Sequence, residues 1–96
     1  MANKLEKKLK KEADKLISLY NTNNPVELEV AARRFTAMFP NQSFGWKVLG
    51  YALQKQKKYH HAHTAYRTSL DLYYNDPELH NNMGVIQKEI GLLVEA

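Results

Sequence analysis

Apolar residues recur at steps of three and four along most of the chain, and clusters rich in Asn, Pro, Gly or Lys interrupt them. That spacing places apolar side chains along one face of an α-helix. The pattern predicts five helices, at about 4–20, about 25–39, between Ser43 and Lys55, at about 59–73 and at about 77–90. We therefore expect one all-α domain that covers residues 1–96.

Helix boundaries are predicted by residues that favour capping. Asn24 suits an N-cap and Pro25 the first helical position, and Asn75-Asp76-Pro77 has the same character before the fifth helix. Pro40 ends the second helix, and Ser43 is expected to cap the third. Gly91 is expected to break the fifth helix.

Each predicted helix has a face that we expect to be buried. In each of the first two helices, this face consists of apolar residues at helical spacing. In the first helix they are Leu5, Leu9, Ala13, Leu16, Ile17 and Tyr20, and in the second they are Leu28, Ala31, Ala32, Phe35, Met38 and Phe39.

The third and fourth helices carry matching stripes that include very small residues. The stripes are Trp46, Leu49, Gly50 and Leu53 on one helix and Ala62, Tyr66, Ser69 and Leu70 on the other. Glycine inside a helix costs roughly 1 kcal/mol relative to alanine, so its presence indicates a close helix contact. We expect Ala62 to meet Gly50 where the two helices cross.

These landmarks resemble the tetratricopeptide repeat (TPR) family, whose pattern is W-x2-L-G…A-x3-F, with Tyr66 in place of Phe. The repeat period of that family relates Leu49 to Met83, Gly50 to Gly84 and Ala62 to Ala96. The resemblance implies a right-handed superhelical stack of antiparallel helix pairs. It divides the chain into a degenerate repeat at 4–40, a complete repeat at 43–76 and a truncated repeat at 77–96.

The sequence departs from the family pattern at three landmarks. Leu53 stands in place of Tyr, Tyr74 in place of the closing Pro, and His80 in place of Trp. These differences leave the expected fold unchanged.

The resemblance implies a peptide-binding surface on the concave face, which the first helix of each repeat lines. The residues that the packing stripe leaves free there are Phe44, Lys47, Tyr51, Gln54, Lys55, Glu78, Asn81, Asn82, Val85, Lys88 and Glu89. Lys47 and Asn82 match two of the five positions of the carboxylate-clamp subclass, which grips acidic C-terminal peptide ends. Tyr51 replaces a clamp Asn. We therefore expect a protein–protein interaction or scaffold module, and an unoccupied polar face is the alternative.

A narrower resemblance suggests a different role. Residues 39–50 and 80–85 are similar to TPR arrays of bacterial proteins related to SPINDLY-type O-linked N-acetylglucosamine transferases. This resemblance implies a non-catalytic amino-terminal TPR region of a glycosyltransferase. It carries no catalytic residue onto this chain.

The last residues suggest a repeat that is cut short. Leu92–Ala96 stands where a sixth helix would begin, so the chain is expected to be a piece of a longer repeat protein. The apolar residues that would then lack cover are Met83, Ile86, Ile90, Leu92 and Leu93. They predict self-association through the carboxyl-terminal helix.

The net charge of +4 is concentrated at one end of the chain. Residues 1–15 hold six lysines against three carboxylates, a balance of +3, which leaves +1 for the rest of the chain. The simplest interpretation is a solvated helix face with Glu6 and Lys10 as an i,i+4 pair. Binding of nucleic acid or of an anionic membrane is an alternative, but the run lacks the arginines and aromatics that usually accompany it. We expect no specific nucleic-acid or membrane partner.

Candidate chemistry is sparse. The chain has no cysteine, no G-x-S-x-G, no H-E-x-x-H and no phosphate-binding glycine loop, so neither an enzyme nor a cofactor is expected. His60 and His63 share a helix face, but a zinc site needs about four ligands, and a pH-dependent surface charge is expected instead of a metal.

No stretch reaches the ~18 apolar residues of a membrane span, and residues 1–8 lack a signal-peptide pattern, so the expected location is the cytoplasm.

Overall fold

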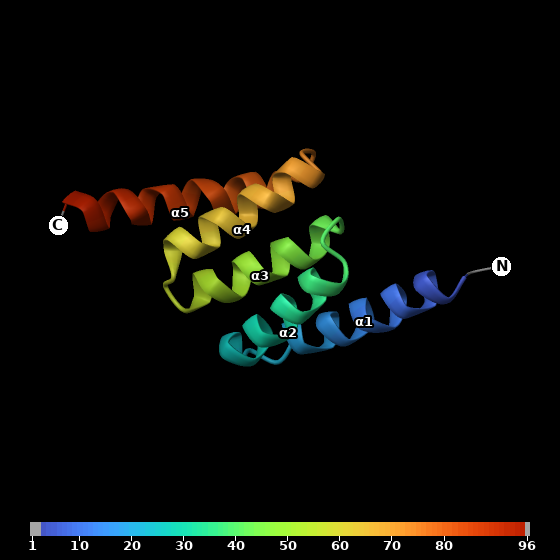
Figure 1. The fold of residues 1–96 in the computed structure, drawn as a ribbon. Helices are drawn as coiled ribbons and strands as arrows, with labels where there is room; N and C mark the ends of the chain where they lie inside the picture. The colour runs from blue at the N-terminus through green and yellow to red at the C-terminus, as the bar shows by residue number, and fades with distance from the viewer. Residues whose placement is uncertain (1–2, 96) are drawn as a thin grey trace.

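The computed structural model describes residues 3–95, and within them it contains five α-helices and no β-strand (Figure 1). The helices are α1 (Lys4–Tyr20), α2 (Pro25–Met38), α3 (Ser43–Lys55), α4 (Tyr59–Leu72) and α5 (Pro77–Glu95). Short turns join them, and each helix packs chiefly against its neighbours in sequence. The predicted all-α fold with five helices is confirmed.

Side-chain caps start three of the helices, as the sequence indicates for two of them. The Oδ1 atoms of Asn24 and Asp76 accept hydrogen bonds from backbone amides three residues later, at 3.2 and 3.1 Å. Asn3 caps α1 in the same way, at 2.8 Å. These bonds satisfy amides that would otherwise have no partner in the first helical turn.

The prediction that Ser43 caps α3 is wrong. Ser43 is the first helical residue, and Gln42 occupies the cap position without a side-chain bond. The turn before α3 is instead held by Trp46, whose indole Nε1 donates to the Pro40 carbonyl oxygen at 2.8 Å. The Ser43 carbonyl accepts a bond from the Ser69 hydroxyl at 2.9 Å, which ties this start to α4.

The turn between α3 and α4 has a left-handed residue that is not glycine. Lys57 has a φ of 61°. Its amide donates to the Gln54 carbonyl and the Lys58 amide donates to the Leu53 carbonyl, each at 2.9 Å. This pair of bonds is the Schellman arrangement, which satisfies the last carbonyls of a helix and usually has glycine at the left-handed position.

All five helices contribute to a single hydrophobic core, but α1 contributes least. Leu16 is its one fully buried residue. The expectation that Leu5, Ile17 and Tyr20 face inward is wrong, since their exposed fractions are 65%, 46% and 37%. The amino-terminal part of α1 projects past α2 in Figure 1, which agrees with the high exposure of Leu5.

Gly50 marks the closest approach between α3 and α4. A β-carbon at this position would overlap the ring of Tyr66, which is completely buried. The sequence predicts Ala62 as the partner of Gly50, but the atoms nearest to a β-carbon at that position belong to the Tyr66 ring. The small residue is therefore needed to make room for an aromatic ring rather than to meet another small residue.

Helix α5 differs from the prediction at its carboxyl end. It continues through Gly91 to Glu95, because a helical glycine costs only about 1 kcal/mol and this one has a negative φ.

The predicted exposure of Met83 and Ile86 on α5 is also wrong, since both pack into the core. The apolar side chains of α5 that are exposed are Val85, Leu92, Leu93 and Val94. Ala96, which the family resemblance relates to Ala62, lies outside the described residues.

A charged cluster around Glu29 fastens α2 to the turn after α3. Its Oε1 accepts from Gln56 Nε2 at 2.8 Å and from Lys58 Nζ at 3.1 Å, and its Oε2 accepts from Arg33 Nε at 2.9 Å. The bond from Arg33 is the largest cause that lowers the pKa of Glu29 from 4.5 to about 2, and those from Gln56 and Lys58 add to it although burial opposes them. Gln56 also donates to the Pro25 carbonyl at 3.3 Å.

We predict that Glu29→Gln lowers the free energy of unfolding at pH 7 by about 1–2 kcal/mol, because it weakens bonds to a charged acceptor. The folded-state pKa of Glu29 is depressed, so its contribution is complete above pH 4.5 and disappears as the pH falls towards about 2. Urea unfolding of both proteins from pH 7 to pH 2 measures this. The difference between them should shrink across that window, and a difference independent of pH would contradict the assignment.

A pair of glycine substitutions tests the packing of α3 on α4. Gly50→Ala should destabilise the protein by about 1–3 kcal/mol, since the new methyl group overlaps the Tyr66 ring. Gly84→Ala is the matched control on α5, where no atom outside the adjoining helix backbone lies within 4 Å of an added β-carbon. It should stabilise by about 0.5–1 kcal/mol through helix propensity alone. Thermal unfolding measures both, and equal shifts of the same sign would rule out the close contact.

Candidate functional site

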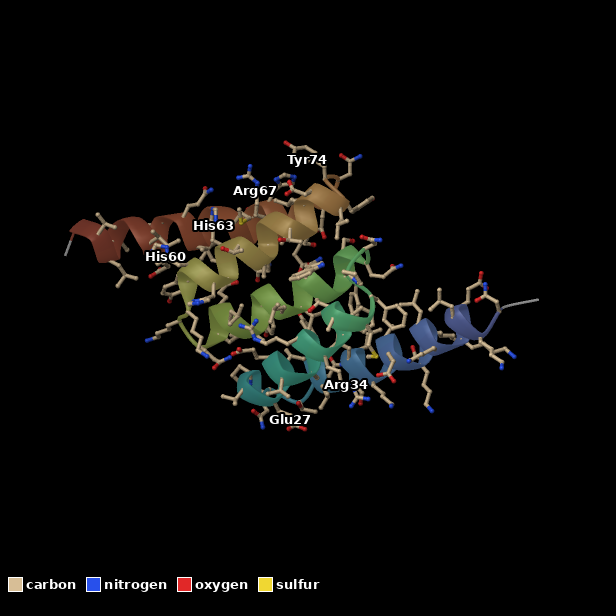
Figure 2. All side chains as sticks on the ribbon, in the orientation of Figure 1. Glu27, Arg34, His60, His63, Arg67 and Tyr74 are labelled. Carbon is tan, nitrogen blue, oxygen red and sulfur yellow. The ribbon has the colours of Figure 1, made fainter. Side chains whose placement is uncertain are left out.

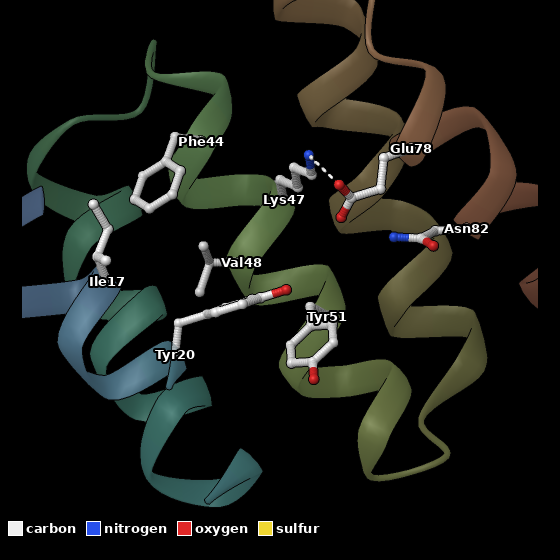
Figure 3. A pocket seen from close by; sticks show the side chains of 8 residues that line it. All are labelled: Ile17, Tyr20, Phe44, Lys47, Val48, Tyr51, Glu78 and Asn82. Atoms are coloured by element: carbon white, nitrogen blue, oxygen red, sulfur yellow. Dashed lines mark ion pairs between the residues drawn. The ribbon is translucent and has the colours of Figure 1, made fainter. Parts of the chain in front are cut away.

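Three helices that are separated in sequence line one groove on the protein. Helices α1, α3 and α5 contribute side chains to a recess of about 260 Å³, which we call the first recess (Figure 3). Its lining residues are Ile17, Tyr20, Phe44, Lys47, Val48, Tyr51, Glu78 and Asn82. Val48 belongs to the hydrophobic core and Tyr51 packs against it, so the floor of the groove is continuous with the core.

The wall of the first recess is apolar and aromatic. The rings of Tyr20 and Tyr51 lie with centroids 4.7 Å apart at a tilt of 37°. Phe44 packs edge-on against Phe35, with centroids 6.2 Å apart, and remains partly exposed to the groove. Burial, followed by the nearby Tyr51 and Glu78, raises the pKa of the Tyr20 hydroxyl, so it is a neutral hydrogen-bonding group at physiological pH.

The charged rim of the first recess is already paired. Lys47 Nζ lies 3.0 Å from Asp76 Oδ2 and 3.8 Å from Glu78 Oε2, and Figure 3 shows the pair with Glu78. Burial alone would raise the pKa of Asp76, but hydrogen bonds from Lys47 and the Leu79 amide lower it below its ordinary value. Asp76 is therefore ionised, and it holds the Lys47 ammonium while it caps α5.

A second recess continues the groove along α3 and α5. It has a volume of about 400 Å³ and shares Tyr51, Glu78 and Asn82 with the first. Its other lining residues are Gln54, Lys55, Lys57, Tyr59, Val85 and Glu89. Lys55 Nζ lies 5.4 Å from the centroid of the Tyr51 ring, a distance within the range of a cation–π contact. The two lysines face two carboxylates, so this recess is polar and balanced in charge.

Tyr66 connects the core to the groove. Its hydroxyl donates to Gln54 Oε1 at 2.8 Å. Burial raises the pKa of the Tyr66 hydroxyl far above its ordinary value, although the Asn82 side chain opposes the shift. The ring that fills the space at Gly50 thus ends beside two polar residues of the groove.

The groove contains most of the residues that the family resemblance singled out. Phe44, Lys47, Tyr51, Glu78 and Asn82 line the first recess, and Gln54, Lys55, Val85 and Glu89 line the second. Asn81 and Lys88 are exposed on α5 and line neither recess. The clamp-like pair Lys47 and Asn82 does share the first recess, but the Lys47 ammonium is occupied by carboxylates of the same chain.

Several lining residues were not predicted from the sequence. They are Ile17, Tyr20 and Val48 in the first recess and Lys57 and Tyr59 in the second. One signal could have found Ile17, because Ile17, Tyr51 and Val85 follow one another at the TPR repeat period and all lie in the groove. The apolar spacing of α1 assigns Tyr20 to the core instead.

The histidines of α4 do not assemble a site. His60 is exposed and His63 is partly buried, and Figure 2 shows both on that helix. Among residues 3–95, no three His, Asp or Glu side chains gather closely enough to hold a metal ion. His80 lies elsewhere, with Nε2 2.8 Å from the Tyr74 carbonyl oxygen.

Comparison with known proteins gives no family for this chain. No protein-family model matches it, and a search of curated proteins finds no relative. In the part of the chain that the structure describes, no helix has the length and apolar character needed to cross a membrane. The role in a glycosyltransferase and the cytoplasmic location remain predictions from the sequence.

Proposed function

We propose that this chain is a TPR-like protein–protein interaction module that binds a peptide segment of a partner in the groove between α1, α3 and α5. The observation that carries the proposal is the apolar wall of the first recess. Tyr20, Phe44 and Tyr51 place aromatic surface in a concave, partly exposed site. Aromatic side chains in such positions are the usual centres of binding energy in protein interfaces.

The arrangement of the helices supports this proposal. If α1 with α2 and α3 with α4 are successive repeats and α5 begins a third, the first helices of the three units should share one face. The groove has that composition, since its lining comes from α1, α3 and α5 together with the α3–α4 turn and the start of α4. The right-handed superhelix and the repeat boundaries are part of the proposal.

The groove also has features that suit an extended peptide. Beside the apolar first recess lies a polar second recess with Gln54, Asn82 and charges of both signs. A segment that crosses both can place one apolar side chain in the first and hydrogen-bond its backbone to the amides of the second. This division between an anchor and adaptable polar contacts is common in peptide recognition.

We predict that peptides selected on this protein from a displayed library of short random sequences lose binding when Tyr20 is replaced by Ala. The variant should bind at least about tenfold more weakly, because a central aromatic side chain often contributes about 2 kcal/mol or more. Fluorescence anisotropy with the selected peptides measures the dissociation constants.

Tyr73→Ala provides the matched control. Tyr73 is an exposed tyrosine at the end of α4 and lines neither recess. The control should bind the selected peptides like the unmodified protein. Selection of no peptide at all, or equal binding by the Tyr20 and Tyr73 variants with unchanged helical circular dichroism, would contradict the proposed function.

A further inference from the structure

The charges around the first recess favour some ligands over others. Among the lining residues and their ion-pair partners, one ammonium group, from Lys47, faces two carboxylates, from Asp76 and Glu78. Lys47 is 28% exposed and Asp76 is 19% exposed at the side chain, so this pair is shielded from solvent, whereas Glu78 is 65% exposed. The rim thus carries a net charge of −1, and its one cation already has a close partner.

The size of the recess sets the kind of group that it can hold. A volume of about 260 Å³ lies below the range of about 300–1,000 Å³ that is usual for whole small-molecule ligands, so it suits one large side chain. The rings of Tyr20 and Tyr51, with centroids 4.7 Å apart at a tilt of 37°, line the recess beside that side chain. Aromatic groups gain from such contacts beyond the area that they bury.

We propose that the first recess recognises an internal segment of a partner protein through one aromatic side chain with neutral or basic neighbours, and that it rejects an acidic chain end. The inference rests on the proposed function, since it names the ligand class of the same groove. A ligand carboxylate would have to compete with Asp76 for Lys47, and it would meet the Glu78 charge. A neutral backbone meets neither obstacle, and a basic neighbour can pair with the exposed Glu78 carboxylate.

Asp76 makes the exclusion of acidic groups hard to relieve by rearrangement. It accepts the amide of Leu79 at 3.1 Å while it binds Lys47 at 3.0 Å. Rotating its side chain away to free Lys47 would remove the cap of α5 as well as an ion pair. Admitting an anion in this way would therefore destabilise the start of α5, which forms one wall of the groove.

Two small probes test the inference by nuclear magnetic resonance titration of the ¹⁵N-labelled protein. They are N-acetyl-phenylalanine amide, which is neutral, and N-acetyl-phenylalanine, which carries a free carboxylate. The neutral probe should shift the amide signals of Tyr20, Val48 and Tyr51, and it should bind about fivefold or more tightly than the anion. This ratio is measured on the unmodified protein, so it does not depend on the folding of a variant.

A charge-removing variant then identifies the cause of the preference. Asp76→Asn combined with Glu78→Gln retains the shape of the rim and a side chain that can cap α5. It should bring the affinity of the anion to that of the neutral probe or above it. Asp14→Asn combined with Asp71→Asn is the matched control, since it removes two exposed carboxylates that line neither recess. The control should leave the ratio unchanged.

Three results would overturn the inference, and they separate it from the proposed function. Tighter or equal binding of the anion, with shifts in the groove, would reject the exclusion of acidic ends but leave the groove as a binding site. An equal change of the ratio in the control variant would assign the effect to overall charge. No shift of any groove signal by either probe at about 20 mM, far above the millimolar affinities of weak contacts, would count against both.

Discussion

The contact between Gly50 and the ring of Tyr66 is the constraint on which the rest of this structure depends. A ring that is completely buried needs a large volume, and the missing side chain at position 50 provides it. The contact fixes how closely α3 and α4 approach. Tyr51 follows Gly50 on the same helix, so the residue next to this contact lines the groove.

Tyr66 is also the link between the core and the candidate site. A buried hydroxyl needs a hydrogen-bond partner, and it finds one in Gln54, a residue of the groove. The same side chain therefore fills the helix interface and orders a polar group on the binding face. Packing and binding are coupled here through one residue rather than through a separate supporting layer.

Local chemistry made the helix boundaries predictable. The caps at Asn24 and Asp76, together with Pro25 and Pro77, act within a single turn, so their effect does not depend on distant residues. The prediction for Gly91 is wrong because a glycine ends a helix only when the backbone changes direction there, and α5 continues past it. Apolar spacing likewise could not distinguish Leu16, which is buried, from Ile17, which faces the groove.

The candidate site was only partly predictable for a related reason. The family resemblance singled out positions such as Phe44 and Tyr51, because it needs only their place in the expected repeat and not their particular partners. It cannot show that Lys47 is bound by Asp76 and Glu78, because that pairing requires α5 to lie beside α3 in space. Tyr20 was missed because the apolar spacing of α1 assigns it to the core, whereas its neighbour in the groove, Tyr51, belongs to a different helix.

Lys57, the left-handed residue in the α3–α4 turn, has a backbone conformation that favours glycine and a charged side chain that borders the second recess. Glycine would adopt the backbone conformation of Lys57 without steric conflict, whereas a residue with a β-carbon adopts it at a cost on the order of 1 kcal/mol. Glycine there would also remove one of the two ammonium groups that border the second recess. The chain thus keeps a conformationally unfavourable lysine at the edge of its groove, where relaxing the turn would change the electrostatic character of the surface it offers to other molecules.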